Sequence, residues 1–372
     1  MRTTLASPES IDRMVALARE HGFNTLIVQV RGRGDAFYRS RWEPRADVLE
    51  TQPATFDPLA HTIARAKPAG LRVHAWINTT LVGNLQELPA SDQHAFHARP
   101  EWLMVPRGVA VELLKVPPED PAYRQRIVEW SLRDLSELEG LYLSPSHPGV
   151  QEHLYNIWMD VVENYEVDGV HFDYVRFPNP TFDYSRAALD RFRAEIDRES
   201  SEEERRLYAR LALTDPLVYT TVYPARWDQF RRDRITALVE RISHGVRQRK
   251  PHVMVSAAVF ADDHDAYGRR FQDWKLWMER GLLDAVAPMA YTVETEVFKR
   301  QIAIARGFSF GRQVWAGIGA YRQPVEGALE KIAMARRIGT DGFVLFSYDS
   351  ISRPSEVNPA GDYLPRVAAG FR

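Results

Sequence analysis

Segments with the apolar spacing of strands alternate with segments with the spacing of helices along the whole chain. A period of two residues is typical of a strand, and a period of three to four is typical of a helix with one buried face. The predicted strands cover residues 24–31, 71–78, 168–178, 252–261, 283–291, 313–319 and 342–348. The predicted helices cover residues 7–22, 57–70, 121–138, 150–165, 227–250, 271–280, 296–306 and 326–338.

This alternation predicts a parallel sheet, because right-handed strand–helix–strand connections place successive strands in parallel. Residues 1–5 resemble the tail of one further strand whose beginning is missing, which would bring the sheet to eight strands. We therefore predict an α/β fold in which residues 1–372 form a single (β/α)8 TIM barrel with an incomplete first strand. Long loops, 79–121 and 178–223, follow the third and fourth strands. The rival is a doubly wound open sheet, but no Gly-x-Gly-x-x-Gly turn supports its dinucleotide-binding form.

Composition narrows the classes of function. The chain has 372 residues and no cysteine, which excludes disulfides, thiolate metal sites and cysteine nucleophiles. A net charge of -2 gives no electrostatic reason to expect nucleic acid as a partner. No apolar run approaches the roughly 18 residues of a membrane-spanning helix, and no signal peptide is visible. We predict no cofactor and no resident metal, and the sequence does not indicate an oligomeric state.

Residues 168–178 carry two ionisable side chains on one face of a predicted strand. Val170 and Phe172 fall on one parity, whereas His171 and Asp173 fall on the other. Strands of a parallel sheet are normally apolar on both faces, because helices cover them. Two ionisable groups inside such a sheet are costly unless something there uses them. This segment is therefore predicted to form the floor of an active site.

Other predicted strands repeat this asymmetry between their faces. The apolar parity must face the outer helices of a barrel, so the polar and aromatic parity faces the interior. Catalytic residues of barrel enzymes come from the C-terminal ends of the strands, where most of these polar groups lie. The side chains on the interior parity include Gln29, Arg31, His74, Trp76, Asn78 and Trp315.

Each candidate also has a structural interpretation. Asp173 either takes part in catalysis or substrate binding, which we favour, or forms a structural ion pair with an arginine. His74 and His171 either line the site or are hydrogen-bonded core histidines. Trp315 either stacks on a sugar ring or fills the barrel, and its glycine neighbours favour the first role.

The two arginines near these strand ends have the same ambiguity. Arg31 and Arg176 either bind substrate or neutralise a nearby carboxylate, Asp173 or Asp35. Arg176 has outward parity in an ideal strand, so it reaches the site only if the strand ends or bends before it.

The segment from Asp168 to Pro178 reads DGVHFDYVRFP and closely resembles the signature of the glycosyl-hydrolase-like family 10 proteins. The resemblance implies a (β/α)8 barrel that hydrolyses a bacterial polysaccharide, peptidoglycan or an exopolysaccharide, outside the cytoplasm. Family members usually begin with a Trp-containing first strand and a leader, and residues 1–5 show neither pattern, so we expect that this stretch starts late within the first strand. Further blocks agree in the same order at residues 22–25, 28–31, 34–38, 56–59, 73–78 and 284–291.

Glycoside hydrolysis normally uses two carboxyl groups that flank the scissile bond. Asp173 is the first candidate, as nucleophile or base. Asp262 continues the inward parity of Ser256 and is the first choice for its partner, ahead of Asp35, Asp263 and Glu294. The residues expected to contact a substrate are Arg31, Asp35, His74, Asn78, His171, Tyr174, Arg176, Tyr291 and Trp315.

Two other functions stay open from the residues alone. In a metal-dependent hydrolase, His74, His171 and Asp173 would offer ligands for a divalent ion. In a barrel that binds a glycan without cleaving it, the site would contain no second catalytic carboxylate beside Asp173. A second inward carboxylate within ~5–10 Å of Asp173 would favour the hydrolase.

Overall fold

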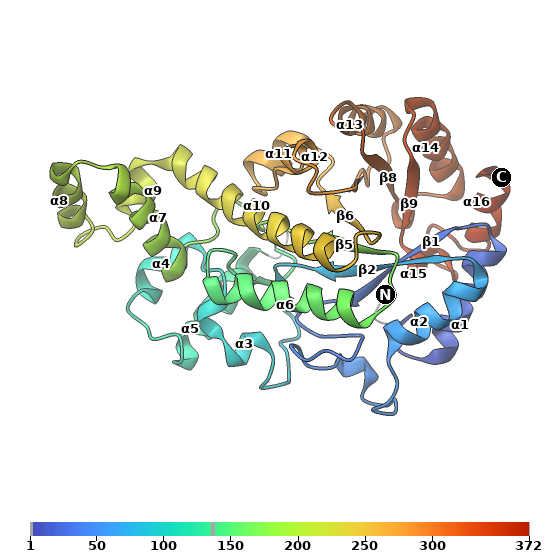
Figure 1. Ribbon diagram of the computed structural model, residues 1–372, viewed down its shortest axis with the longest axis horizontal. Helices are drawn as coiled ribbons and strands as arrows, with labels where there is room; N and C mark the ends of the chain where they lie inside the picture. The colour runs from blue at the N-terminus through green and yellow to red at the C-terminus, as the bar shows by residue number, and fades with distance from the viewer. Residues whose placement is uncertain (1–2, 135–137, 372) are drawn as a thin grey trace.

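The computed structural model describes residues 3–134 and 138–371, which form one curled parallel sheet with helices packed on its outer face (Figure 1). The sheet order is β1-β2-β5-β6-β7-β8-β9, so the strands follow one another in the sheet as they do in the chain. The predicted parallel α/β architecture is confirmed. The sheet strands are β1 (Thr25–Arg31), β2 (Arg72–Asn78), β5 (Gly169–Asp173), β6 (Met254–Val259), β7 (Ala285–Pro288), β8 (Gln313–Gly319) and β9 (Gly342–Phe346).

A short antiparallel pair, β3 (Leu81–Gly83) and β4 (Leu141–Tyr142), lies outside this sheet. The α-helices are α1 (Pro8–Glu20), α2 (Pro58–Ala66), α3 (Ala95–Ala98), α4 (Arg107–Leu113), α5 (Pro121–Ser131), α6 (Pro148–Asn164), α7 (Arg186–Glu199), α8 (Glu202–Leu211), α9 (Val218–Val222), α10 (Pro224–Arg249), α11 (Asp263–Gly268), α12 (Trp274–Glu279), α13 (Thr295–Gly307), α14 (Val325–Ile338), α15 (Tyr348–Ile351) and α16 (Tyr363–Phe371). Short 3-10 helices cover Asp47–Leu49, Lys67–Ala69, Pro100–Trp102, Leu132–Asp134 and Ala320–Arg322.

Local sequence signals set where the first helices begin. The Ser7 hydroxyl accepts a hydrogen bond from the Ser10 backbone N–H, and Pro8 occupies the first turn of α1. The Asp57 carboxylate accepts from the Ala60 N–H at 2.9 Å and begins α2 in the same way. Such caps satisfy backbone N–H groups that have no partner within the helix.

The outward parity of β5 packs against the helix that precedes it. Val170 and Phe172 are fully buried, and the Phe172 ring lies 3.9 Å from the Trp158 ring of α6, centroid to centroid. The interior parity therefore belongs to His171 and Asp173, as the alternation predicted.

The sheet does not close between β9 and β1 within the described part of the chain. Thr3–Leu5 form a turn, so the expected strand at the N-terminus is wrong for its described residues, and residues 1–2 lie outside them. All five residues of β9 are half-buried, whereas all five residues of β5 are buried. A cavity of about 570 Å³ is lined by both β1 and β9 and reaches inward to Asp173.

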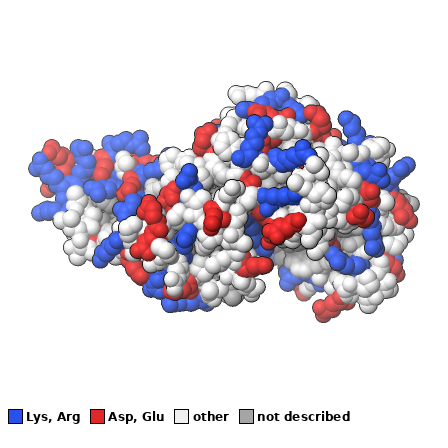
Figure 2. Space-filling view, turned by 90° about the horizontal axis from the view of Figure 1, so that it is seen from below, with Lys and Arg blue, Asp and Glu red and all other residues white. Residues whose placement is uncertain are grey.

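The two predicted long loops contain structure of their own: residues 79–121 hold β3, α3 and α4, and residues 178–223 hold α7, α8 and α9. Each belongs to a longer excursion from the sheet. The first excursion, from β2 to β5, also holds β4, α5 and α6, and the second, from β5 to β6, also holds α10. In Figure 1 α7, α8 and α9 form an arm that extends away from the sheet, and α10 returns from it alongside α6. Figure 2 shows both signs of charge intermixed over the face seen from below, the arm included. Among the described residues, no helix is both long and apolar enough to cross a membrane.

Candidate active site

Asp173 ends β5 at the inner end of the large cavity. It lies opposite Asn78 of β2 in the sheet register and is one of the residues that line the 570 Å³ cavity. The next residue, Tyr174, has a φ of 49° and donates its backbone N–H to the Asp173 carboxylate at 2.7 Å. A positive φ is uncommon for a residue with a Cβ, so the chain leaves the strand abruptly at this point.

Burial controls the ionisation of Asp173. The side chain is only 9% exposed, and the loss of hydration raises its pKa to about 6, against the hydrogen bond from Tyr174 and the charge of Arg176. Among the described residues, no arginine forms an ion pair with Asp173. The alternative in which Asp173 is a structural ion-pair partner is therefore not supported by a direct contact. Asp173 is therefore a carboxyl that exchanges its proton near neutral pH beside a cavity.

Glu139 is the carboxylate that the sequence analysis missed. One oxygen accepts from Arg176 Nη2 at 2.9 Å and the other accepts from the Tyr142 hydroxyl at 2.8 Å. Burial raises the pKa of Glu139, but the charge of Arg176 and these hydrogen bonds outweigh it and leave the pKa below its usual value. The charge of Glu139 in turn raises the pKa of Asp173, so the two carboxyl groups are electrostatically coupled.

The exposure of Glu139 leaves its carboxylate accessible to a substrate, and its position in irregular backbone explains why the sequence analysis missed it. Its side chain is 45% exposed, so the carboxylate is anchored but reachable from solvent. It precedes β4 in irregular backbone, where no strand or helix period marks which face a side chain occupies.

Arg176 reaches the site because the chain turns at Tyr174. Its guanidinium carbon lies 4.6 Å from the Tyr174 ring centroid and 5.0 Å from that of Phe260. It pairs with Glu139 rather than with Asp173 or Asp35, the two partners weighed from the sequence. Its Nε and Nη1 atoms are buried and have no hydrogen-bond partner among the described residues.

An aromatic wall lies near Asp173 at the C-terminal ends of the strands. The rings of Tyr291 and Phe346 are stacked, with centroids 5.3 Å apart and planes 10° apart. The Trp76 ring lies edge-on to Phe346 at 6.0 Å, and Tyr321 is 42% exposed at the rim. Burial and the charge of Asp173 both raise the pKa of Tyr291, which shows that this ring is close to the carboxyl. Phe346 and Tyr321 were not predicted as site residues.

The two inward histidines line the same cavity as Asp173, one and two layers before it in the sheet register. His171 Nδ1 lies 2.9 Å from the Ser256 hydroxyl, and burial lowers its pKa to about 3. Burial also lowers the pKa of His74 to about 4, and its ring lies 5.7 Å from that of Trp315 near the start of β8. All three side chains line the cavity that also contains Asp173. Both imidazoles are neutral at pH 7, and the contact of His74, His171 and Trp315 with substrate stays a prediction.

The metal-dependent alternative lacks its ligand set. Within residues 3–134 and 138–371, no group of three or more His, Asp or Glu side chains converges as a metal ion requires. His74, His171 and Asp173 occupy successive layers of the interior, as their register shows.

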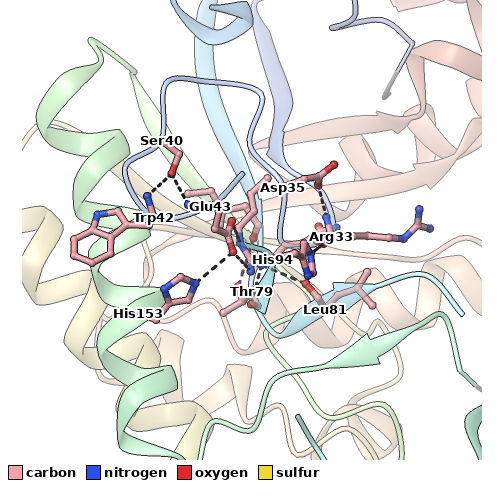
Figure 3. A network of polar contacts seen from close by, with 12 residues as sticks. Arg33, Asp35, Ser40, Trp42, Glu43, Thr79, Leu81, His94 and His153 are labelled. Atoms are coloured by element: carbon pink, nitrogen blue, oxygen red, sulfur yellow. Dashed lines mark hydrogen bonds and ion pairs between the residues drawn. The ribbon is translucent and has the colours of Figure 1, made fainter. Parts of the chain in front are cut away.

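Arg31 is fully buried and serves the fold, which corrects its expected contact with substrate. Its guanidinium donates to both oxygens of Glu43, at 2.7 and 2.6 Å, and to the carbonyls of Asn78, Thr79 and Leu81. Figure 3 shows this network around Glu43, with His153 of α6 lying 3.5 Å away. Arg31 therefore ties the loop after β1 to the end of β2.

Asp35 and Asn78 hold the neighbouring loop in shape. The Asp35 carboxylate is nearly buried and accepts from the Arg33 backbone N–H at 2.8 Å. Asn78 accepts from the Trp76 indole at 2.7 Å and donates to the Gly32 carbonyl at 2.7 Å. The sequence placed these residues at the correct end of the sheet, and their contact with substrate stays a prediction.

Asp262 does not point into the cavity, which corrects its expected place beside Asp173. It is exposed and caps α11 by accepting from the Asp265 N–H at 2.9 Å. The inward parity of Ser256 does not extend to it, because β6 ends at Val259. Its neighbour Asp263 pairs with Lys275.

Comparison of the sequence with models of known protein families decides which family the chain belongs to. The model of the Glycosyl hydrolase-like 10 family matches residues 2–136 and 125–307. The chain belongs to this family. The resemblance seen in the DGVHFDYVRFP segment is thereby confirmed.

Relatives and solved structures agree with this membership. The chain is 26% identical to Glycosyl hydrolase DigH of Escherichia coli strain K12 over 311 residues. This match covers 78% of the chain and 59% of DigH. The chain is 24% identical over 290 residues to Glycosyl hydrolase YngK of Bacillus subtilis strain 168, which covers 73% of this chain and 46% of YngK. The chain thus spans about half to three fifths of the relatives it matches. The PgaB (BpsB) glycoside hydrolase domain from Bordetella bronchiseptica has a similar fold, with a TM-score of 0.63, 14% identity and coverage of 96% of this chain and 93% of that one.

Proposed function

We propose that this protein is a glycoside hydrolase that cleaves a bacterial cell-wall or extracellular polysaccharide with Asp173 and Glu139. The observation that carries the proposal is the electrostatic coupling of two carboxyl groups. Asp173 lines the large cavity and has a pKa raised to about 6, whereas the pKa of Glu139 is lowered. Two carboxyl groups whose environments push their pKa values apart are suited to separate acid and base roles.

The pKa values assign the roles in a different order from the one that the sequence favoured. Asp173 keeps its proton more readily, so it acts as the general acid that protonates the leaving oxygen. Glu139 stays ionised through Arg176 and acts as the nucleophile or base. The expectation from sequence was that Asp173 would be the nucleophile or base.

The aromatic wall supports a sugar as the substrate. Flat rings pack against the C–H face of a sugar ring while polar groups at their edges reach its hydroxyls. Tyr291 and Phe346 supply such a surface, and Tyr321 extends it toward solvent. DigH and YngK are named glycosyl hydrolases, and the PgaB domain is a glycoside hydrolase domain, which supports the same class of substrate. With a polysaccharide of this kind as substrate, the protein would act outside the cytoplasm.

We further propose that residues 1–372 are one domain built on a (β/α)8 barrel. The space between β1 and β9 would be the place of the eighth strand, because β1 and β9 both line the cavity there and β9 is half-buried throughout. Seven parallel strands in chain order support this interpretation.

The test compares hydrolysis of purified bacterial polysaccharides by the wild type and by the Asp173→Asn and Glu139→Gln variants. Both variants should lose about 10²–10⁴-fold in kcat, the size of the contribution from a positioned acid or base. Asp262→Asn is the matched control, because Asp262 is exposed at a helix cap, and it should keep activity within about twofold. Equal loss of activity in the control, or full activity in Asp173→Asn, would refute the assignment.

The non-catalytic alternative is tested by the same samples. A barrel that only binds glycan would show binding by the wild type and no release of reducing ends from any polysaccharide tried. In that case Asp173→Asn would change the affinity alone.

A further inference from the structure

A second cavity, of about 170 Å³, lies in the two excursions, away from the candidate active site. It is bordered by α4, α5 and α7 and shares no lining residue with the cavity that reaches Asp173. We propose that this second cavity is an accessory binding site for one neutral sugar unit of a glycan chain. The choice of a sugar rests on the proposed function, whereas the site itself rests on the observations below.

Part of the cavity wall is apolar. Val105, Ala110 and Leu113 are buried residues that line it, and Leu114 adds a further aliphatic surface. At roughly 30 Å³ per water, the cavity has the volume of five or six waters, which is comparable to one sugar ring. An apolar wall of this kind gains free energy by contact with the C–H face of a ligand.

Two tyrosines in the cavity lining have hydroxyls without a partner among the described residues. The side chains of Tyr123 and Tyr184 are at least nine-tenths buried, at 5% and 6% exposure, and both line the cavity. Neither hydroxyl has a hydrogen-bond partner within residues 3–134 and 138–371. Both hydroxyl oxygens nevertheless stay accessible to solvent, although the rings are buried. Buried tyrosine hydroxyls usually have a partner, so these two are placed to bond a ligand in the cavity.

The charges at the rim select for a neutral ligand. Two carboxylates line the cavity, Glu101 and Asp190, and each accepts hydrogen bonds only. One guanidinium lies with them, Arg186, and it already donates to the Leu114 carbonyl. Sugar hydroxyls are donors that satisfy carboxylates, whereas the carboxylate of an acidic sugar would be repelled. The structure therefore favours a neutral sugar over a uronic acid.

The wall of this cavity is directly connected to the candidate active site. The Met104 backbone N–H donates to the Tyr142 carbonyl at 2.8 Å, and the Tyr142 hydroxyl bonds Glu139. The next residue, Val105, lines the second cavity, and its carbonyl accepts from the Tyr184 N–H at 2.8 Å. A polymer held here would keep a second stretch of its chain at high local concentration near Asp173.

The test uses calorimetric titration of the full chain carrying Asp173→Asn, with chitotetraose and cellotetraose as neutral probes and tetragalacturonate as the acidic one. Ala187→Phe, from the rim of the cavity on α7, should fill the site and remove one equivalent of neutral probe. Ala194→Phe, exposed on the same helix and outside the cavity, is the matched control and should keep that equivalent. Tyr123→Phe and Tyr184→Phe keep the rings and should each weaken this site about five- to tenfold.

The outcomes separate this proposal from the proposed function. Loss of one equivalent in Ala187→Phe alone, with tetragalacturonate excluded, supports the accessory site whether or not the wild type hydrolyses a polysaccharide. Equal stoichiometry in the two alanine variants, no binding of either neutral probe, or equal binding of tetragalacturonate would overturn it. Circular dichroism of Ala187→Phe, compared with that of Ala194→Phe, verifies that the helix is intact.

Discussion

At the scale of single residues, the ionisation of Asp173 predicts the pH dependence of activity. A general acid works only in its protonated form, and burial raises the pKa of Asp173 to about 6. The value of kcat/KM should therefore fall as the pH rises through about 6. Glu139 must be ionised and its pKa is lowered, so the acidic limb should lie well below that value. Initial rates on one polysaccharide between about pH 2.5 and pH 9 measure both limbs.

The opposite slope would reverse the roles of the two carboxyl groups. If activity rises as the pH passes through about 6, Asp173 must lose its proton to work, and it is the base or nucleophile that the sequence favoured. The control is a substrate-saturated series, because kcat reports the complex and kcat/KM reports the free enzyme.

At the scale of elements, the buried pair of Arg31 and Glu43 should hold the loop after β1. Their side chains are 0% and 2% exposed, so Glu43→Gln leaves a buried guanidinium without its counter-charge. We expect a loss of about 3–5 kcal/mol in the free energy of unfolding. Glu112→Gln is the matched control, because its pair with Arg126 is 49% and 35% exposed and should contribute less than about 1 kcal/mol. Urea unfolding of both variants measures the difference, and equal losses would contradict the structural role of the pair.

Strand periodicity explains which site residues could be predicted. Within β5 the alternation of faces placed Asp173 inside the sheet, because side chains of a strand alternate strictly. Beyond the strand ends this rule fails: Asp262 follows β6 and caps a helix, and Arg176 reaches the site only through the turn at Tyr174. Glu139 lies in irregular backbone, so its approach to Asp173 depends on tertiary contacts that no local period encodes.

At the scale of the whole molecule, the two excursions explain why one sheet carries two separate cavities. The first excursion supplies Glu139 and Tyr142 to the candidate active site, and both excursions supply walls to the second cavity. Helices of the excursions, α4, α5 and α7, line the second cavity, whereas the helices that line the large cavity, α1, α14, α15 and α16, lie beside the space between β1 and β9. The sheet thus positions Asp173, and the first excursion adds the Glu139 carboxylate whose charge raises the pKa of Asp173.

The open side of the sheet should be its least protected part. The backbone of β9 pairs with β8 on one side, and neither β9 nor β1 has a strand partner on the other side within the described chain. Amide groups on an unpaired edge open to solvent by smaller, local fluctuations than those of a central strand. Amide hydrogen exchange of β1 and β9 should therefore be roughly tenfold or more faster than that of β5 and β6, which are paired on both sides. Mass spectrometry of peptides from these four strands measures the ratio. Equal protection would mean that the two edges are covered in solution by a further strand, as a complete barrel requires, and would favour the closed form of the fold.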